Sequence, residues 1–482
     1  MPSKKFWETN KRVSPKHRSS PAVQPVTDSI NSSRIGAAGA ERLTTAIIWA
    51  YSTPRIAFGI MGILFATYLM KFSTDVLLIA PAVMGMLIAG SRLWDAISDP
   101  LVGYLSDNTR SRHGRRRIWL FYSAIPIGIG LVMMWSPPTG LVNLELVIWM
   151  GVALLVYETA STAFYVPHGA LGVELTPNYH ERTRLFGYSH MIGAIGMLLG
   201  LASLQLMNMA DDKREFAVLL SVSAAVCVSA IIMGSTYLLP ERTDYQGRGN
   251  ASILNSFLDV VRNKHARLLL IMYAIETFGA ASVALLVPYL VEYVLPMQVY
   301  MVPLLLVYVI PQFIFTPIWI NLSRQYGKKR LWLWSMGMSA LFFTSGYFFL
   351  QPGEFSYFIW PGAFLLGLAA GGAAVVAPAI KADIIDYDEY LTHERKEGAY
   401  LAVWNLVRKS AASLTVLVTG FVLQFWGFQP NAEQSLDTQH AILALFTLLP
   451  GLCYVIGTII FTRFSFNEQE HKAVRLALDE RK

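Results

Sequence analysis

Long apolar runs constrain this chain more than any other sequence feature. A helix needs about 20 mostly apolar residues to cross a bilayer, and runs of that length recur along almost the whole sequence. Because their apolar residues are continuous rather than alternating, a transmembrane β-barrel is excluded. We expect an all-α membrane protein with twelve spanning helices. The predicted spans lie near residues 43–70, 79–105, 118–137, 144–171, 187–209, 216–239, 266–293, 299–322, 332–351, 355–380, 400–426 and 440–462.

The composition narrows the class of protein further. Hydrophobic residues make up 54% of the 482 residues and charged residues only 15%, against about 25% charged residues in ordinary soluble proteins. This excludes a disordered chain, a disulfide-stapled secreted domain and most soluble enzymes. Both cysteines lie inside apolar runs, so we expect neither a structural disulfide nor a cysteine metal site. The net charge is +7, but the basic residues lie between apolar runs, and no nucleic-acid partner is expected.

The polar stretch 240–265 divides the spans into two sets of six. It predicts an N-terminal half at 43–239, a cytoplasmic central loop, and a C-terminal half at 266–462. Residues 1–42 and 463–482 are expected to be polar, basic tails. The N-terminal tail has no apolar stretch of the kind that a cleavable signal peptide needs.

The placement of Lys and Arg predicts the orientation in the membrane. If the N-terminus is cytoplasmic, both tails and the loops on that side hold 32 of the 39 Lys and Arg residues. The opposite side holds only Lys71, Lys213 and Arg214. Cytoplasmic loops carry an excess of basic residues. We therefore expect a multi-pass protein of the cell (inner) membrane with both termini in the cytoplasm.

The two halves resemble each other. The Asp-Pro pair at 99–100 parallels the Thr-Pro pair at 316–317, and each is followed by a glycine and a basic run. The sequence His-Glu-Arg at 180–182 recurs at 393–395. Two parallel six-helix halves are the architecture of the major facilitator fold, which holds substrate and coupling ions near mid-membrane between the halves.

A pair of carboxylates occurs in one half only. Asp95 and Asp99 share a helix face, since they are four residues apart, whereas Gln312 and Thr316 take their places in the second half. A requirement of the scaffold would be expected in both halves, so we interpret the pair as a cation site. The pair suits a sodium ion, because this metal ion takes oxygen ligands. It also suits a proton shared between the two carboxylates. The alternative is a structural ion pair between Arg92 and Asp95.

The fourth span carries a polar stripe of Glu158, Thr162 and Tyr165 that is expected to face the second span. Thr162 can supply a further oxygen ligand or bond back to its own helix. Glu158 can titrate, and it needs a partner at this depth. We consider it a coupling residue together with Arg92.

Arg55 lies about 18 Å into the first span at 1.5 Å per residue. It can bind an anionic or hydroxyl-rich ligand, or pair with Glu158 or Glu276. Lys409 and Glu276 are also candidate substrate contacts, with a structural ion pair as the alternative for each. The loop at 107–117 combines Asp107 with several arginines, and we expect ion pairs there to lock the cytoplasmic gate.

At these residues the chain resembles the glycoside–pentoside–hexuronide:cation symporters, the melibiose-carrier group. The similarity rests on Arg-Leu-Trp-Asp-Ala-Ile-Ser-Asp-Pro-Leu-Val-Gly at 92–103 and Ala-Asp-Ile-Ile-Asp-Tyr-Asp-Glu-Tyr at 382–390. It extends over roughly 43–465. For coupling or gating, the resemblance adds Asp383, Asp386 and Arg395.

The resemblance implies roles residue by residue. The cation ligands match Asp95, Ser98, Asp99 and Thr162, although the melibiose carrier has an asparagine at the Ser98 position. Lys409 matches a lysine of the eleventh span.

At the positions that bind the sugar in the melibiose carrier, this chain has different residues. Tyr165 stands where that carrier has an aspartate that holds galactoside hydroxyls, and His190 stands where it has an arginine. We therefore do not expect galactosides. Arg55, Tyr165 and His190 together favour an anionic substrate.

The predicted function is alternating-access symport of a glycoside, sugar acid or related small solute with Na⁺ or H⁺. A lysophospholipid:cation symporter is the first alternative, and a non-transporting membrane sensor is the second. The chain has no Walker, Rossmann, HExxH or GxSxG sequence, so neither ATP-driven transport nor enzyme activity is expected. We expect no cofactor beyond the coupling ion, and a monomer whose partners are the solute, the cation and the lipid bilayer.

Overall fold

The structure is a computed structural model that describes residues 42–176, 179–241, 260–392, 397–466 and 468–480. Leu43–Lys482 form one compact unit. The predicted N-terminal tail, most of the central loop and Arg395 lie outside the described residues.

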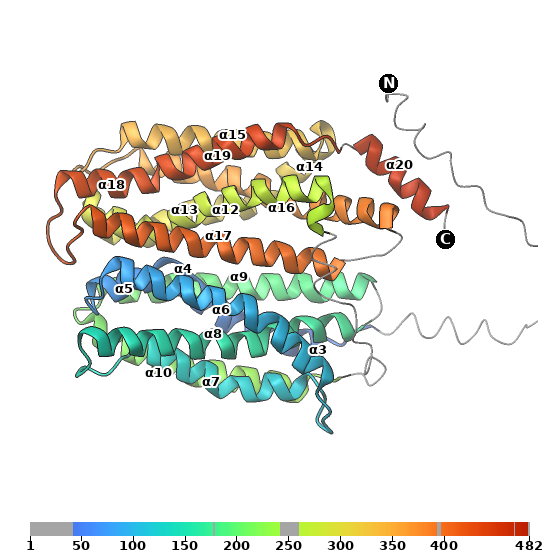
Figure 1. The fold of residues 1–482 in the computed structure, drawn as a ribbon, viewed down its shortest axis with the longest axis horizontal. Coiled ribbons are helices and arrows are strands. Elements are labelled where there is room, and N and C mark those ends of the chain that lie inside the picture. The colour runs from blue at the N-terminus through green and yellow to red at the C-terminus, as the bar shows by residue number, and fades with distance from the viewer. Residues whose placement is uncertain (1–41, 177–178, 242–259, 393–396, 467, 481–482) are drawn as a thin grey trace, which may run out of the picture. The chain divides into compact units, whose positions relative to one another are not determined.

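Helices account for nearly all of the described chain (Figure 1). The first half comprises α3 (Thr45–Ser52), α4 (Pro54–Thr67), α5 (Leu69–Asp75), α6 (Pro81–Asn108), α7 (Arg117–Trp135), α8 (Asn143–Glu174), α9 (Tyr179–Met209) and α10 (Lys213–Leu238). The second half comprises α12 (Lys264–Tyr289), the π-helical turn η2 (Leu290–Val294), η3 (Gln298–Tyr300), α13 (Met301–Ile314), α14 (Thr316–Tyr326), α15 (Lys328–Phe349), α16 (Ile359–Thr392), α17 (Glu397–Phe425), α18 (Leu436–Phe446), α19 (Leu448–Thr462) and α20 (Glu468–Asp479).

The twelve predicted spans correspond to these helices in order, and three of the spans are broken. The first runs through α3, α4 and α5, the eighth through α13 and α14, and the twelfth through α18 and α19. By length and hydropathy, nine helices of the described chain are able to cross a membrane, or ten if the bent α13–α14 pair is one span. Helices α6 and α15 are not among them, and Arg92, Asp95 and Asp99 lower the mean hydropathy of α6.

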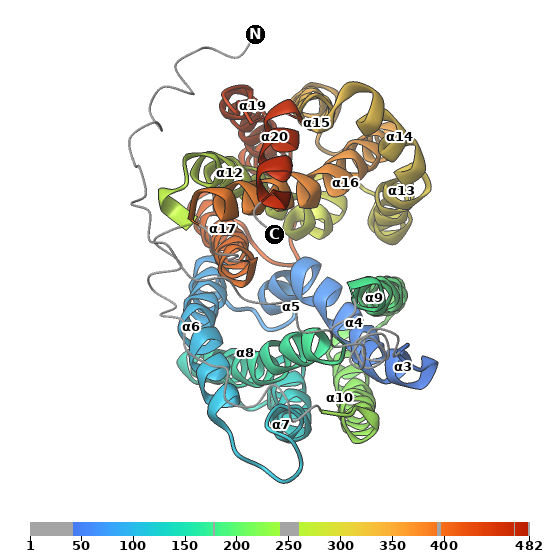
Figure 2. The same cartoon turned by 90° about the vertical axis from the view of Figure 1, so that its right-hand side faces the viewer.

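The C-terminal segment differs from the predicted polar tail, because it contains the amphipathic helix α20. His471 of α20 lies 3.1 Å from Asp386 of α16, and Val474 and Leu478 are buried against the second half. The end-on view shows the helices of the two halves as two groups (Figure 2). Since α4, α6, α12 and α17 lie at the boundary, side chains from both halves meet there.

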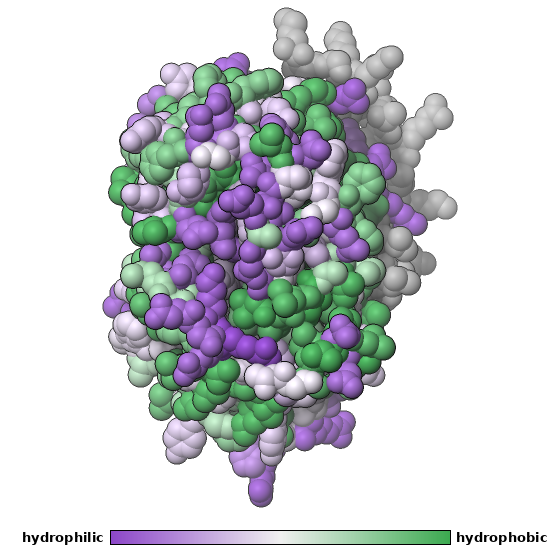
Figure 3. All heavy atoms as spheres, turned by 90° about the vertical axis from the view of Figure 1, so that its left-hand side faces the viewer, coloured by the Kyte–Doolittle hydropathy of each residue, from purple (hydrophilic) through white to green (hydrophobic). Residues whose placement is uncertain are grey.

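One end of the bundle, which we call the α5 end, is closed by contacts between the halves. Figure 3 shows hydrophilic side chains among apolar ones across this end. Lys71 is buried and lies 2.8 Å from Glu292 of the other half, besides pairing with Asp75 on its own helix. Tyr293 donates to Asp75 at 2.7 Å. Two further bonds cross the boundary, one between the hydroxyls of Thr74 and Tyr289 and one from the Asn431 amide to the Asp75 carbonyl.

Glycines hold α4 and α9 in close contact. A Cβ atom on Gly196 would lie 2.3 Å from the carbonyl oxygen of Ile56, and one on Gly200 would meet the backbone of Ile60 at 2.9 Å. Small residues of this kind let helices approach closely in a membrane, where van der Waals packing drives helix association. The contact fixes the relative position of α4 and α9, which carry Arg55 and His190.

We therefore expect Gly196→Ala to destabilise the protein by about 1–3 kcal/mol, because the methyl group overpacks a backbone contact. The measurement is the thermal unfolding midpoint in detergent. Gly234→Ala is the control, since its added methyl group would meet nothing within 4 Å. Equal midpoints for the two variants would contradict the packing argument.

Candidate functional site

A cavity of about 720 Å³ lies between the halves, in the middle of the bundle. Side chains from α4, α6 and α8 line it on one side, and side chains from α12 and α17 line it on the other. Its charged lining residues are Arg55, Arg92, Asp95, Asp99, Glu158, Arg408 and Lys409. The cavity thus brings most of the predicted site residues together.

Lys409 bridges the carboxylate pair. Its Nζ lies 2.7 Å from Asp99 Oδ2 and 3.2 Å from Asp95 Oδ2. Asp95 is 1% exposed, whereas the Asp99 side chain is 34% exposed to the cavity. The contact is the ion pair across the halves that the sequence left open for Lys409. The lysine ammonium therefore lies beside both carboxylates of the predicted cation site.

Arg92 neutralises the remaining acid of the cavity. Its Nη1 lies 3.0 Å from Glu158 Oε1 and 3.5 Å from Asp95 Oδ2, and its guanidinium stacks 4.6 Å from the centre of the Phe65 ring. The pairing of Arg92 with Asp95, which was the structural alternative, is thus present. Glu158 pairs with Arg92, and the described chain shows no pairing of Glu158 with Arg55, which was one of the alternatives for Arg55.

Two hydroxyl groups flank the carboxylates. Thr162 donates to Asp99 Oδ1 at 2.9 Å, so its hydroxyl bonds across to α6 rather than back to α8. The Ser98 hydroxyl and Asp95 Oδ1 are buried without a hydrogen-bond partner among the described residues. These two oxygens can therefore coordinate a cation at the predicted site.

Arg55 and Tyr165 line this cavity and an adjoining one of about 420 Å³. His190 lines the adjoining cavity, so the three residues that favoured an anionic substrate lie around two cavities that share Arg55 and Tyr165. No acidic side chain of the described chain pairs with Arg55, and its Nε is buried without a hydrogen-bond partner. Tyr165 packs against Phe58, with ring centres 4.3 Å apart.

Arg408 is a cavity residue to which the sequence assigned no role. It lies on α17 and lines the cavity, as Arg55 does from α4, and its side chain is exposed without an acidic partner in the described chain. It is near enough to Tyr165 to interact with that residue electrostatically. The missed signal was an arginine one position before Lys409, inside a predicted span.

Glu276 lines neither cavity. It interacts instead with Lys381 of α16, whose ammonium lies 4.0 Å from the centre of the Tyr273 ring and 5.3 Å from that of Trp404. Lys381 was not predicted as a site residue. The contacts with Tyr273 and Trp404 indicate that this partly buried charge belongs to the packing of the second half.

The predicted gating residues form ion pairs within each half. Asp107 pairs with Arg116 at 2.7 Å, and Glu174 accepts from Arg116 and Arg115 at 2.8 Å. In the second half, Asp383 pairs with Lys328 at 2.6 Å. In the first half these pairs join the segment between α6 and α7 to the ends of α6 and α8. In the second half the pair joins the start of α15 to α16.

The charges of the cavity fall into two groups. Asp95, Asp99 and Glu158 pair with Arg92 and Lys409, whereas Arg55 and Arg408 have no anionic partner among the described residues. A small cation can replace the lysine ammonium at the first group. An anion can bind between the two arginines of the second group.

The comparisons with known proteins agree with this geometry. A family model described as MFS/sugar transport protein matches residues 50–468. The inner membrane symporter YicJ of Escherichia coli K12 is 23% identical over 400 residues, which cover 82% of this chain and 86% of that protein. The glucuronide carrier protein homolog of the same organism is 24% identical over 465 residues, covering 92% and 97%.

A solved structure shares the fold. The crystal structure of a D-xylose-proton symporter superposes with a TM-score of 0.66 at 14% identity, covering 88% of this chain and 98% of that chain. The match of the family model to most of the chain, together with the symporter relatives, confirms the predicted fold and function class. The chain therefore belongs to the MFS/sugar transport family, among its glycoside–pentoside–hexuronide:cation symporters, and is a cation-coupled secondary transporter rather than an enzyme.

Proposed function

We propose that Asp95, Asp99 and Thr162 bind the coupling ion, Na⁺ or H⁺, and that Lys409 takes its place when the ion leaves. The observation that carries this proposal is the Lys409 ammonium, which contacts both carboxylates from the other half. A carboxylate pair inside a membrane needs a compensating cation at every stage. The lysine and the ion are two such cations, and they compete for the same oxygens.

This competition links ion binding to the movement of the halves. Asp95 and Asp99 lie on α6, and Lys409 lies on α17, so the ion pair joins the two helices across the boundary. Binding of an ion frees Lys409 and weakens that connection. The ion thereby changes the relative free energies of the states that open to opposite sides, as coupling requires.

The proposed substrate is an anionic glycoside or sugar acid. Arg55 and Arg408 approach the cavity from different halves, and both lack an acidic partner in the described chain. A carboxylate between them would receive charge-assisted hydrogen bonds from both. The relative named as a glucuronide carrier homolog is consistent with this class, since a glucuronide carries a carboxylate.

The charged lining argues against the lysophospholipid alternative. Seven charged side chains line the cavity between the halves. Acyl chains in this cavity would remove water from these charges without replacing its hydrogen bonds. A short polar solute suits this lining better.

The proposed setting is the cell (inner) membrane, with both termini in the cytoplasm and the chain acting as a monomer. The bias of Lys and Arg toward the tails and the loops on one side supports this orientation. The α5 end then faces outward, and the closed contacts there correspond to an inward-facing state. The coupling ion and the solute are the only small partners that the proposal requires.

We expect Arg55→Gln to weaken binding of methyl β-D-glucuronide by about 10- to 100-fold, because a charge-assisted hydrogen bond is lost. Binding of methyl β-D-glucoside, which differs only in the carboxylate, should change little. The measurement is isothermal titration of the purified protein at saturating Na⁺. Arg324→Gln, an exposed arginine outside the cavity, is the matched control.

An equal loss for both sugars would make Arg55 a structural residue. Binding of the glucoside alone by the wild type would reject the anionic class. Arg408→Gln should repeat the selectivity of Arg55→Gln, since the two side chains share the anion.

A further inference from the structure

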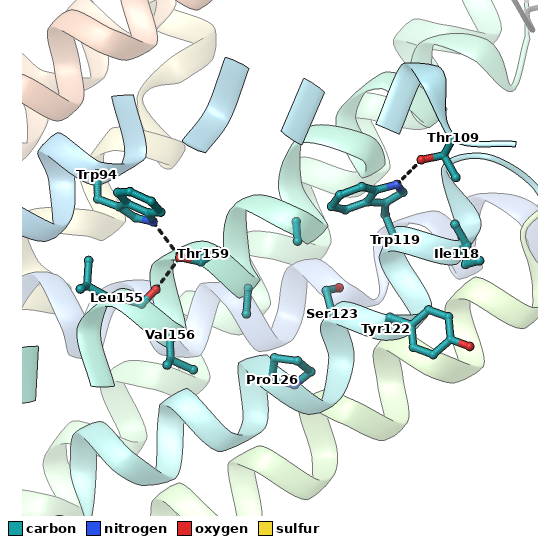
Figure 4. Close-up of a pocket in the computed structure, with 12 residues that line it drawn as sticks. Trp94, Thr109, Ile118, Trp119, Tyr122, Ser123, Pro126, Leu155, Val156 and Thr159 are labelled. Carbon is teal, nitrogen blue, oxygen red and sulfur yellow. Dashed lines mark hydrogen bonds between the residues drawn. The ribbon is translucent and has the colours of Figure 1, made fainter. Parts of the chain in front are cut away.

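A second large cavity lies on the outer face of the first half, away from the transport cavity. It has a volume of about 770 Å³ and lies between α6, α7 and α8 (Figure 4). Trp94 lies at one end of this groove, and Thr109 and Trp119 lie at the other. The same helices expose Ile97, Leu101 and other large apolar side chains. Since the chain spans a membrane, this face is in contact with lipid.

Most polar side chains of the lining are already bonded inside the protein, whereas Tyr122 is 70% exposed. Trp94 donates to Thr159 at 2.8 Å, and Trp119 donates to Thr109 at the same distance. The Thr159 and Ser123 hydroxyls bond to backbone carbonyls. The groove therefore offers an apolar surface without free donors along most of its length, and it suits a hydrocarbon chain.

The groove is long enough to hold an acyl chain of one leaflet. Fifteen residues separate Trp94 from Thr109, which corresponds to about 22 Å along α6. Half of a bilayer core is about 15 Å thick. An acyl chain in the groove would thus place its headgroup near Thr109.

Two exposed arginines lie at that end. Arg110 and Arg112 form no ion pair in the part of the chain that the structure describes. The other arginines of the same loop are engaged: Arg115 and Arg116 bind Glu174, and Arg117 donates to the carbonyls of Thr236 and Tyr237. The loop thus leaves two free positive charges beside the groove.

We propose that the groove binds one acyl chain of an anionic phospholipid whose phosphate is held by Arg110 and Arg112. The apolar lining binds the acyl chain of the lipid, and the two arginines favour a headgroup with a negative charge. Juxtamembrane Lys and Arg residues attract anionic lipid in this way. Trp94 lines the groove and precedes Asp95, so the bound lipid contacts the helix that carries the carboxylate pair.

The test counts lipids retained by the purified protein in native mass spectrometry. Phosphatidylglycerol and phosphatidylethanolamine with identical chains are compared at equal concentration. We expect the wild type to retain one phosphatidylglycerol preferentially, and R110Q/R112Q to bind it about 30-fold more weakly, from two lost charges. R324Q/R330Q is the control, because it removes two exposed arginines of the second half. Equal retention by all three proteins would overturn the proposal.

A second variant tests the groove itself without changing charge. Ala163 lines the groove, and A163F should fill it and reduce phosphatidylglycerol retention. Unchanged retention in A163F would overturn the acyl-chain part, as would full competition by soluble glycerol phosphate.

A measurement in intact vesicles guards against loss of folding in detergent. Phosphatidylglycerol with a brominated chain should quench Trp94 and Trp119, so the quenched fraction should fall in W119F. The same quenched fraction in wild type and W119F would also overturn the proposal.

Discussion

We expect Asp95→Asn and Asp99→Asn each to reduce cation-driven uptake to the level of vesicles without protein, while the protein stays folded. Each change removes one anionic ligand from the proposed cation site. The remaining carboxylate is then compensated by Lys409, which lies within 3.2 Å of both acids, and Asp95 has Arg92 as a second partner. An external cation therefore gains little by entering. Coupled uptake disappears because ion binding no longer changes the balance between the states.

The measurement is uptake of labelled substrate into proteoliposomes with an inward Na⁺ or H⁺ gradient. Asp211→Asn is the matched control, since Asp211 is an exposed loop carboxylate. Thermal unfolding in detergent checks the fold of each variant. Uptake at the wild-type rate in either variant would place the coupling ion elsewhere.

The two variants should differ in stability. Asp95 is buried and interacts with both Arg92 and Lys409. Its loss leaves two cations with fewer partners, which is costly in a buried network. Asp99 is partly exposed to the cavity and loses less by the same change. We therefore expect Asp95→Asn to unfold at a lower temperature than Asp99→Asn.

The sequence predicted the fold well because hydropathy acts locally. A spanning helix requires a run of apolar residues, and each run became one helix or a short series of helices at the predicted place. The breaks at Thr53, Tyr68, Phe315 and Thr447 were not predicted. A bent span has the same mean hydropathy as a straight one, so composition carries no signal for the bend.

The candidate site was predictable where its residues share a helix face. The spacing of Asp95 and Asp99 and the stripe of Glu158, Thr162 and Tyr165 placed them together, since i,i+4 neighbours lie on one side. Which arginine neutralises Glu158 was not predictable, because that depends on how α6 and α8 are rotated against each other.

Contacts between the halves were the least predictable part. From the sequence, Lys71 was only one of the three basic residues predicted on the side opposite the cytoplasm. In the structure it is the centre of a network that joins the halves at the α5 end. Its partner Glu292 lies more than 200 residues away in the chain. The only local signal was the i,i+4 spacing of Lys71 and Asp75.

Lys71→Met is expected to open the α5 end. Lys71 is 2% exposed and lies between Asp75 and Glu292, with its ammonium 4.5 Å from the centre of the Tyr293 ring. Removing the lysine leaves two carboxylates facing each other without a cation. Breaking a buried ion pair in this way costs about 3–5 kcal/mol. That cost falls on the closed state, since water reaches both carboxylates once the halves separate at this end.

A difference of that size changes the populations by more than about 100-fold. The measurement is the distance between spin labels at Leu78 and Val299, which are exposed on different halves near this end, in a protein with Cys227→Ser. We expect the variant to gain a longer-distance population that the wild type lacks. Lys213→Met, another lysine on the sparsely charged side, should leave the distances unchanged.

The double variant Lys71→Met/Glu292→Gln separates the ion pair from simple loss of packing. Removing the second charge leaves only Asp75 without its cation, and Asp75 keeps its hydrogen bond from Tyr293. The closed population should therefore recover in part. If both variants keep the wild-type distance distribution, the α5 end is held by its hydrogen bonds and aromatic packing, and the lysine is not the element that keeps it closed.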